Sequence, residues 1–274
     1  MVKAGKRSGK GTRVILVLTD FSTIAENAVV HGLELAQRLQ YKVCLLHVTR
    51  GESVLEKVEK NMMDCIARCE QKFAVKIDAL IRDGNLFKVV NKVVSVIKPV
   101  VMVMGTHGKQ GLQHLFGSHA LKLVLDSPCP VMVVQDEFPG TGYNHIVIPV
   151  NIDADPENLA KWSMAIGTLF HSAVTLFLSK EESEERSRQL RNITSLITGV
   201  LAEQHIPFTI TAAESVADFP GQVIAWSEKN HSSLLMTMAM PTAGGTGHSF
   251  SDWNERLMFN SGRMPVLFID RAEP

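Results

Sequence analysis

The stretch Arg13–Thr19, which reads RVILVLT, decides the fold class of this 274-residue chain. Its unbroken apolar character is typical of a strand buried on both faces of a parallel sheet. Outward from it, apolar runs alternate with helix-length segments, which predicts an α/β fold with helices covering a parallel sheet. Thr23 and Glu26 have the spacing of a capping box and predict a helix start. The expected helices include 23–39, 86–97 and one ending near 126, and the expected strands are 42–48, 75–81, 100–104 and 131–134.

The same order of elements begins again about 131 residues later. HIVIPV at 145–150 resembles the opening strand, and Asp155 followed by Pro156 is typical of a helix start. Each half therefore predicts an open, parallel, five-stranded sheet of order 3-2-1-4-5 flanked by helices. The further strands of the second half are expected at 173–178, 207–213, 233–238 and 265–270. The expected boundaries are a flexible basic tail at 1–12, a first domain at 13–136, a Gly- and Pro-rich linker at 137–144 and a second domain at 145–274.

Composition excludes several classes of partner. With 28 basic and 28 acidic residues the formal net charge is zero, so no field of the whole protein attracts nucleic acid or an anionic membrane. No stretch approaches the roughly 18 apolar residues that a membrane span needs, and no apolar signal segment follows the basic tail. We therefore expect a cytoplasmic protein. Cys65 and Cys69 are four residues apart on an expected helix, but no ligands complete a metal set, so we interpret them as packing residues.

The candidate ligand crevice lies where strands one and four end, at the point where the strand order reverses. Strand one ends in Thr19-Asp20-Phe21-Ser22. Asp20 is either a ligand contact or an ordinary turn residue, and the residues alone favour neither interpretation.

Glycines follow strand four. Gly105 and Gly108 lie in the run GTHGKQG, and Gly117 and Ser118 precede the last helix of the first half. Glycines let the backbone approach a phosphate, and a helix N-terminus favours an anion, although Ser118 also suits a simple N-cap. These positions predict a phosphate site. Neither a Rossmann fingerprint after the first strand nor a P-loop at the expected position is present, so this is not a standard nucleotide motif.

Five short motifs together carry a family resemblance. They are TDFS at 19–22, LLHV at 45–48, GTHG at 105–108, GS at 117–118 and SPCPVMVV at 127–134. With these motifs the chain resembles the universal stress protein family, as two such domains in tandem. In ATP-binding members the glycine motif is G-x2-G-x9-G-[ST].

The resemblance implies a site and an assembly. Gly105, Gly108, Gly117 and Ser118 would hold the phosphates and ribose, Asp20 would contact adenine, and the backbone at Val48 would border it. The two halves would pair through their last strands, Val131–Val134 and Val266–Ile269, as an intramolecular pseudo-dimer. Two positions depart from the family pattern: eight residues rather than nine separate Gly108 from Gly117, and Leu18 stands where several members have Pro.

The second half departs further from the pattern. Asn151 replaces the aspartate, and approximately Asp252 and Trp253 replace the glycine and serine before the last helix. A carboxylate and an indole would repel and crowd a phosphate. We expect the second domain to be a structural partner, with the glycine run 244–247 as a flexible loop.

The resemblance predicts a stress-response protein that binds ATP, or ADP or AMP, in its first domain, with Mg²⁺ allowed as a companion. His47, His107, His114 and His119 lie in or near the crevice, yet no base and orienting partner or paired carboxylates accompany them. We therefore name no catalytic residue and no resident metal, and expect at most slow ATP hydrolysis. The alternative is a pseudo-dimer scaffold that binds a protein partner and no nucleotide. A further homodimer of the tandem and the identity of a protein partner stay open.

Overall fold

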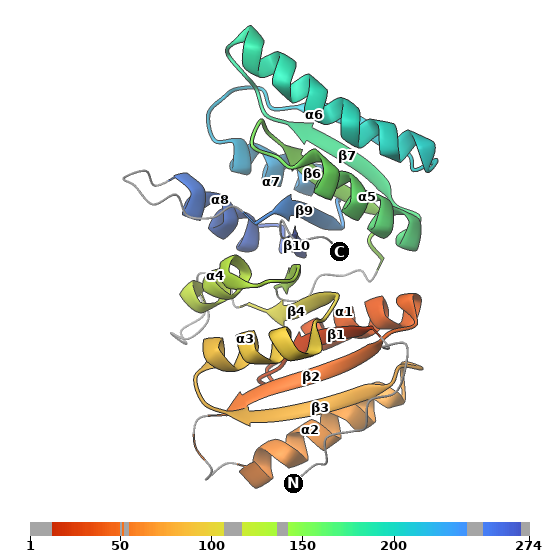
Figure 1. The fold of residues 1–274 in the computed structure, drawn as a ribbon, viewed down its shortest axis with the longest axis vertical. Coiled ribbons are helices and arrows are strands. Elements are labelled where there is room, and N and C mark those ends of the chain that lie inside the picture. The colour runs from red at the N-terminus through yellow and green to blue at the C-terminus, as the bar shows by residue number, and fades with distance from the viewer. Residues whose placement is uncertain are drawn as a thin grey trace.

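Ten strands form one continuous sheet in the computed structural model of this chain (Figure 1). The structure describes residues 13–49, 51, 55–106, 117–135, 142–239 and 249–269. Here the first half means residues 13–135 and the second half residues 142–269. The first half contains β1 (Val14–Leu18), α1 (Thr23–Leu39), β2 (Lys42–Thr49), α2 (Leu55–Glu70), β3 (Ile77–Asp83), α3 (Leu86–Ile97), β4 (Val101–Gly105), α4 (Gly117–Asp126) and β5 (Val131–Val134).

The second half repeats that order of elements. It contains β6 (His145–Val150), α5 (Pro156–Phe170), β7 (Ala173–Leu178), α6 (Glu184–Glu203), β8 (Phe208–Ala212), α7 (Phe219–Lys229), β9 (Leu234–Met238), α8 (Ser249–Met258) and β10 (Val266–Ile269). The repeat keeps its register closely: Val14 pairs with Lys42, and 131 residues later His145 pairs with Ala173.

The two halves join edge to edge. The strand order is β3-β2-β1-β4-β5-β10-β9-β6-β7-β8, which contains the expected 3-2-1-4-5 order twice. Strands within each half are parallel, whereas β5 and β10 are antiparallel, with Leu267 opposite Met132. The predicted pseudo-dimer and its pairing strands are therefore confirmed, and the two sheets are in fact one.

Helices cover both faces of this sheet. The apolar faces of α1, α2, α5 and α6 pack in one core, and those of α3, α4, α7 and α8 pack in the other. Side chains of the joining strands alternate between the two cores, with Met132 and Leu267 in the first and Val133 and Phe268 in the second. Both cores therefore continue across the junction of the halves.

The helix starts follow local sequence, with one correction. Asp155 caps α5 and Pro156 is its first residue, as expected. In α1, however, the cap is Ser22, whose hydroxyl accepts a hydrogen bond from the N–H of Ala25 at 3.2 Å. The capping box expected from Thr23 and Glu26 is wrong, because the chain turns into the helix one residue earlier.

Tyr143, just before β6, packs against both halves. Its hydroxyl lies 2.5 Å from Nδ1 of His31 on α1, and its ring meets Phe170 of α5 edge-on at 4.7 Å. Both His31 and Tyr143 are buried, and burial lowers the pKa of His31 to about 4. A neutral histidine is therefore part of the contact between the halves.

The cysteines, the search for membrane spans and the domain boundaries can also be compared with the sequence expectations. Cys44, Cys65 and Cys129 are buried and Cys69 is half-buried; within the described ranges, no three potential metal ligands gather. No helix in the described part of the chain is long and apolar enough to cross a membrane. The tail at 1–12 and most of the linker lie outside the described residues, and the division into two domains stays a prediction.

Candidate functional site

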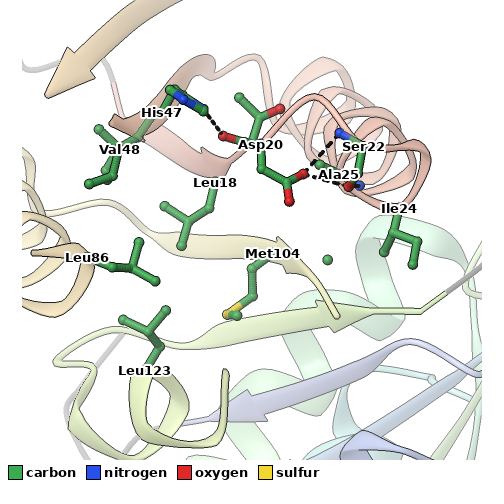
Figure 2. Close-up of a pocket in the computed structure, with 13 residues that line it drawn as sticks. Leu18, Asp20, Ser22, Ile24, Ala25, His47, Val48, Leu86, Met104 and Leu123 are labelled. Atoms are coloured by element: carbon green, nitrogen blue, oxygen red, sulfur yellow. Dashed lines mark hydrogen bonds between the residues drawn. The ribbon is translucent and has the colours of Figure 1, made fainter. Parts of the chain in front are cut away.

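A pocket lies at the carboxyl ends of β1, β2 and β4, where the strand order reverses (Figure 2). It encloses about 580 Å³, part of it open to solvent. The strand ends contribute Leu18, Thr19, Asp20, Leu46, His47, Val48, Met104 and Gly105, and the helices contribute Ser22, Ile24, Ala25, Leu86 and Leu123.

Asp20 stands at the rim of the pocket with its carboxylate held by the turn that follows. Its Oδ1 accepts hydrogen bonds from the N–H of Ser22 at 3.0 Å and from the Ser22 hydroxyl at 2.5 Å (Figure 2). Among the described residues, its Oδ2 accepts no hydrogen bond. Asp20 is therefore oriented through one oxygen and keeps the other for an additional donor.

The second half shows that the turn itself needs no charge. Asn151 occupies the position of Asp20, 131 residues later, and its Oδ1 accepts a hydrogen bond from the N–H of Asp153 at 3.1 Å. An amide oxygen and a carboxylate oxygen thus make the same turn. The negative charge at position 20 is in excess of what the fold requires.

His47 braces the same loop. Its Nδ1 lies 2.7 Å from the carbonyl oxygen of Thr19, so Nδ1 carries the proton, and its ring stacks on Phe21 at 4.7 Å. The backbone of Phe21 has a φ of +63°, a left-handed conformation that residues other than glycine adopt at an energetic cost. The N–H of Phe21 donates a hydrogen bond to the Thr19 hydroxyl at 3.1 Å. The sequence placed His47 beside the crevice but gave no sign that it supports a strained turn.

Gly105 has a packing role that the sequence did not reveal. A Cβ at this position would lie 2.7 Å from Cγ2 of Ile24 and 2.9 Å from the Ile24 carbonyl oxygen. Glycine is therefore required for the first turn of α1 to lie against the end of β4. The strand pairings place the buried Met238 at the equivalent point of the second half.

Of the remaining predicted site residues, the structure describes some and not others. Val48 lines the pocket. Gly117 and Ser118 form the start of α4, the helix whose Leu123 also lines the pocket. Gly108 lies outside the described residues, as do His107 and His114. The structure therefore brings together Asp20, Val48 and Gly105, and it places Gly117 and Ser118 as the first two residues of α4 and not before it.

The equivalent crevice in the second half is larger and charged. It encloses about 1750 Å³, again partly open, and its lining includes Asn151. Glu181 accepts hydrogen bonds from Arg186 at 2.6 Å and from Ser179 at 2.7 Å. Partial burial opposes ionisation, but these two bonds hold the pKa of Glu181 below its usual range.

A pair of aromatic rings occupies the base of this second crevice. Trp253 is 9% exposed, stacks on Phe219 at 5.4 Å and donates from Nε1 to the Thr237 hydroxyl at 3.3 Å. Beside them an ion pair with Arg256 lowers the pKa of Asp218. Asp252 and Trp253 lie inside α8, which begins at Ser249, and not before it as the sequence suggested.

Comparison with known proteins identifies the first half. The sequence model of the universal stress protein family matches residues 11–135. The first half belongs to the universal stress protein family. Among curated protein sequences, none matches this chain.

Solved structures extend the likeness to the second half. A universal stress protein from Archaeoglobus fulgidus DSM 4304 has a TM-score of 0.74 at 12% identity, covering 95% of this chain and 99% of its own. A putative universal stress protein from Pseudomonas aeruginosa UCBPP-PA14 has a TM-score of 0.63 at 14% identity, covering 94% and 93%. Both halves therefore have the fold of universal stress proteins. A universal stress protein in complex with cAMP covers 46% of this chain and 98% of its own at 17% identity, and its TM-score of 0.40 adds nothing to the fold comparison.

Proposed function

We propose that the first half binds an adenine nucleotide, ATP or its relatives ADP and AMP, in the pocket at the ends of β1, β2 and β4. One observation carries the proposal: Asp20 keeps a negative charge that its turn does not need, at the rim of a mainly apolar pocket. A carboxylate oxygen is a strong acceptor for an exocyclic amino group, because a hydrogen bond to a charged partner is stronger than one between neutral groups.

The pocket wall suits a flat, apolar base. Leu18, Val48, Leu86 and Leu123 approach it from two strands and two helices (Figure 2). The base would lie among these side chains with its amino group toward Oδ2 of Asp20. The phosphates would then extend toward Gly117 and Ser118 at the start of α4, where free backbone N–H groups and the helix dipole favour an anion. Mg²⁺ would accompany the nucleotide and needs no resident protein site.

Binding, rather than turnover, fits the chemistry of this pocket. Among its described lining residues, Asp20 is the only charged side chain. Nδ1 of His47 donates its hydrogen bond to the Thr19 carbonyl oxygen. Phosphoryl transfer needs positioned cations and a group that orients the nucleophile. We infer a stress-response role in which nucleotide occupancy alters the conformation or partners of the chain, with at most slow ATP hydrolysis.

A second candidate is a scaffold that binds a protein partner and no nucleotide. The contact between Gly105 and Ile24 favours it, because that glycine is required by packing whether or not a phosphate is bound. The glycine spacing, one residue shorter than the family pattern, is consistent with it.

Native mass spectrometry during titration with ATP distinguishes the two candidates. We expect one adenine nucleotide per chain, and its loss in Gly117→Glu, which places a carboxylate at the start of α4. Gly199→Glu is the matched control, since Gly199 is exposed on α6 and an added side chain there meets nothing within 4 Å. The absence of binding at millimolar ATP would contradict the proposal and leave the scaffold. Sustained phosphate release that His107→Ala abolishes would instead indicate an enzyme.

A further inference from the structure

The continuous sheet ends in two edge strands, β3 in the first half and β8 in the second. They stand at opposite ends of the strand order, where β8 pairs with β7, and Figure 1 shows β3 beside α2. An edge strand exposes unpaired backbone N–H and C=O groups that can pair with another chain, and proteins usually protect such edges with charged side chains.

Charge protects β3. Asp78 forms an ion pair with Lys42 at 3.0 Å. Asp83 accepts hydrogen bonds from the Thr49 hydroxyl at 3.1 Å and from the N–H of Gly51 at 2.7 Å. Arg82, between them on the strand, is exposed. A second strand laid against this edge would have to accommodate three charged positions.

No such protection exists on β8, which reads FTITA. Phenylalanine, threonine and isoleucine are residues that favour strands. Ile210, at its centre, is 51% exposed. Within the described part of the chain, β8 pairs only with β7. An uncharged edge strand with an exposed isoleucine at its centre is a ready template for strand addition.

The backbone of β8 has a defined outward face. The N–H of Val174 donates to the carbonyl oxygen of Pro207, and the N–H of Ala213 donates to that of Leu178. The N–H and C=O groups of successive residues in a strand point to opposite sides within the plane of the sheet. The backbone groups of Pro207 and of the odd-numbered residues up to Ala213 therefore point toward β7. The N–H and C=O groups of Phe208, Ile210 and Ala212 therefore point away from the sheet.

We propose that β8 is the interface through which two copies of this chain pair, antiparallel and about a two-fold axis at Ile210. In that register Ile210 meets Ile210 of the second copy, and Phe208 meets Ala212, so a large side chain faces a small one. All three residues present outward backbone groups, which lets them exchange both hydrogen bonds with their opposites. Thr209 lies opposite Thr211, a favourable cross-strand pair, and no like charges meet.

A second copy fits this edge better than an unrelated strand because the sequence of β8 is complementary to itself. An isologous contact of this kind uses the same surface twice and closes at a dimer. The molecule already joins its own halves in the same manner, through antiparallel pairing of β5 with β10. The result would be a continuous sheet that crosses both copies.

Light scattering after size-exclusion chromatography tests the proposal across a wide concentration range. We expect a mass twice the 30.2 kDa of one chain, and a return to 30.2 kDa in Ile210→Lys, which adds a charge to the edge. Val96→Lys is the matched control, since Val96 is 76% exposed on α3, and it should leave the dimer intact. A wild-type monomer at every concentration, or a dimer that survives in correctly folded Ile210→Lys, overturns the proposal.

Cross-linking tests the register independently of stability. In the proposed dimer, Ile210→Cys places two thiols opposite each other, whereas Thr209→Cys places each thiol opposite a threonine. Mild oxidation to a disulfide, which requires Cα atoms within about 7 Å, should therefore cross-link Ile210→Cys more efficiently than Thr209→Cys, with wild type giving the background from the native cysteines. Equal cross-linking of both variants contradicts the two-fold axis at Ile210.

Discussion

The two crevices of this molecule occupy equivalent places in a repeated fold but differ in character. The first-half crevice is a narrow apolar pocket with Asp20 at its rim, whereas the second-half crevice is wide and holds two ion pairs. Backbone topology and strand register are the same on both sides of the junction. The chemistry of each crevice is therefore determined by a few side chains at the strand ends and on the neighbouring helices, and not by the fold.

Three exchanges account for most of the difference. Asp20 becomes Asn151, which keeps the turn and removes the charge. Met238 stands in the second half where the first half has Gly105. Its buried side chain prevents α5 from packing as close to β9 as α1 packs to β4. In the second half, Trp253 and Phe219 stack in the base of the crevice. Each exchange can be tested by a substitution, from the largest expected effect to the smallest.

Trp253→Ala should have the largest effect on stability. The indole is almost fully buried, and deleting a buried tryptophan costs about 3–5 kcal/mol. The free energy of unfolding, measured by urea denaturation, should fall by that amount. Trp226→Ala is the comparison, because Trp226 is only partly buried and should cost less. A loss no larger than that of Trp226→Ala would show that the aromatic stack does not organise the second crevice.

Acidification from pH 6.5 to 4 should weaken the fold through His31, which has no counterpart in the second half. His31 on α1 corresponds to Trp162 on α5, so only the first half has a buried titratable group at this point. Burial lowers the pKa of His31 from 6.5 to about 4. Below pH 6.5 the unfolded chain binds a proton that the folded chain does not, so stability falls as the pH drops from 6.5 toward 4.

The size of this loss follows from the pKa difference. At about 1.4 kcal/mol per pKa unit, the loss from His31 approaches about 3 kcal/mol at pH 4. His31→Asn keeps a group that can form a hydrogen bond with the Tyr143 hydroxyl and cannot titrate. Between pH 6.5 and 4, the free energy of unfolding of His31→Asn should therefore fall less than that of wild type. The difference between the two proteins should reach up to about 3 kcal/mol. Parallel pH profiles of the two proteins would contradict the assignment.

The sequence predicted the fold more fully than the site. Buried parallel strands are continuous apolar runs, so the positions of the strands could largely be predicted, whereas the pairing of 131–134 with 266–269 followed from the family resemblance. The predicted strand at 75–81 lies two residues too early, because the β3 edge carries charge and lacks such a run. The need for glycine at 105 depends on Ile24, which is distant in sequence, and local pattern cannot show that contact. The positive φ of Phe21 was hidden for the same reason, since the ring of His47 supports it.

Gly105→Ala should destabilise the first half by about 1–3 kcal/mol, the usual cost of overpacking. The added methyl group would meet the backbone of Ile24, which cannot rotate away as a side chain can. Gly199→Ala is the matched control: it lies within α6 with open space around it and should stabilise the chain by about 0.5–1 kcal/mol. Urea denaturation of both variants measures the contrast. If Gly105→Ala is neutral, glycine at this position is not required by packing, and a phosphate becomes the better explanation for it.

Asp20→Asn should have the smallest effect on stability and still change function. It gives the first half the residue that the second half already has, and Asn151 shows that an amide oxygen sustains the turn. The free energy of unfolding should therefore change by less than about 0.5 kcal/mol, as for most surface substitutions. The affinity for ATP, measured by calorimetry, should fall at least about tenfold, because the Nδ2 amide of asparagine, which donates, replaces the accepting Oδ2 and the amino group of the base loses its acceptor. The reverse change, Asn151→Asp, should create no ATP site, since Trp253 and Phe219 still occupy the second crevice. Unchanged affinity in Asp20→Asn would mean that the aspartate is only a turn residue and that the two crevices differ in shape alone.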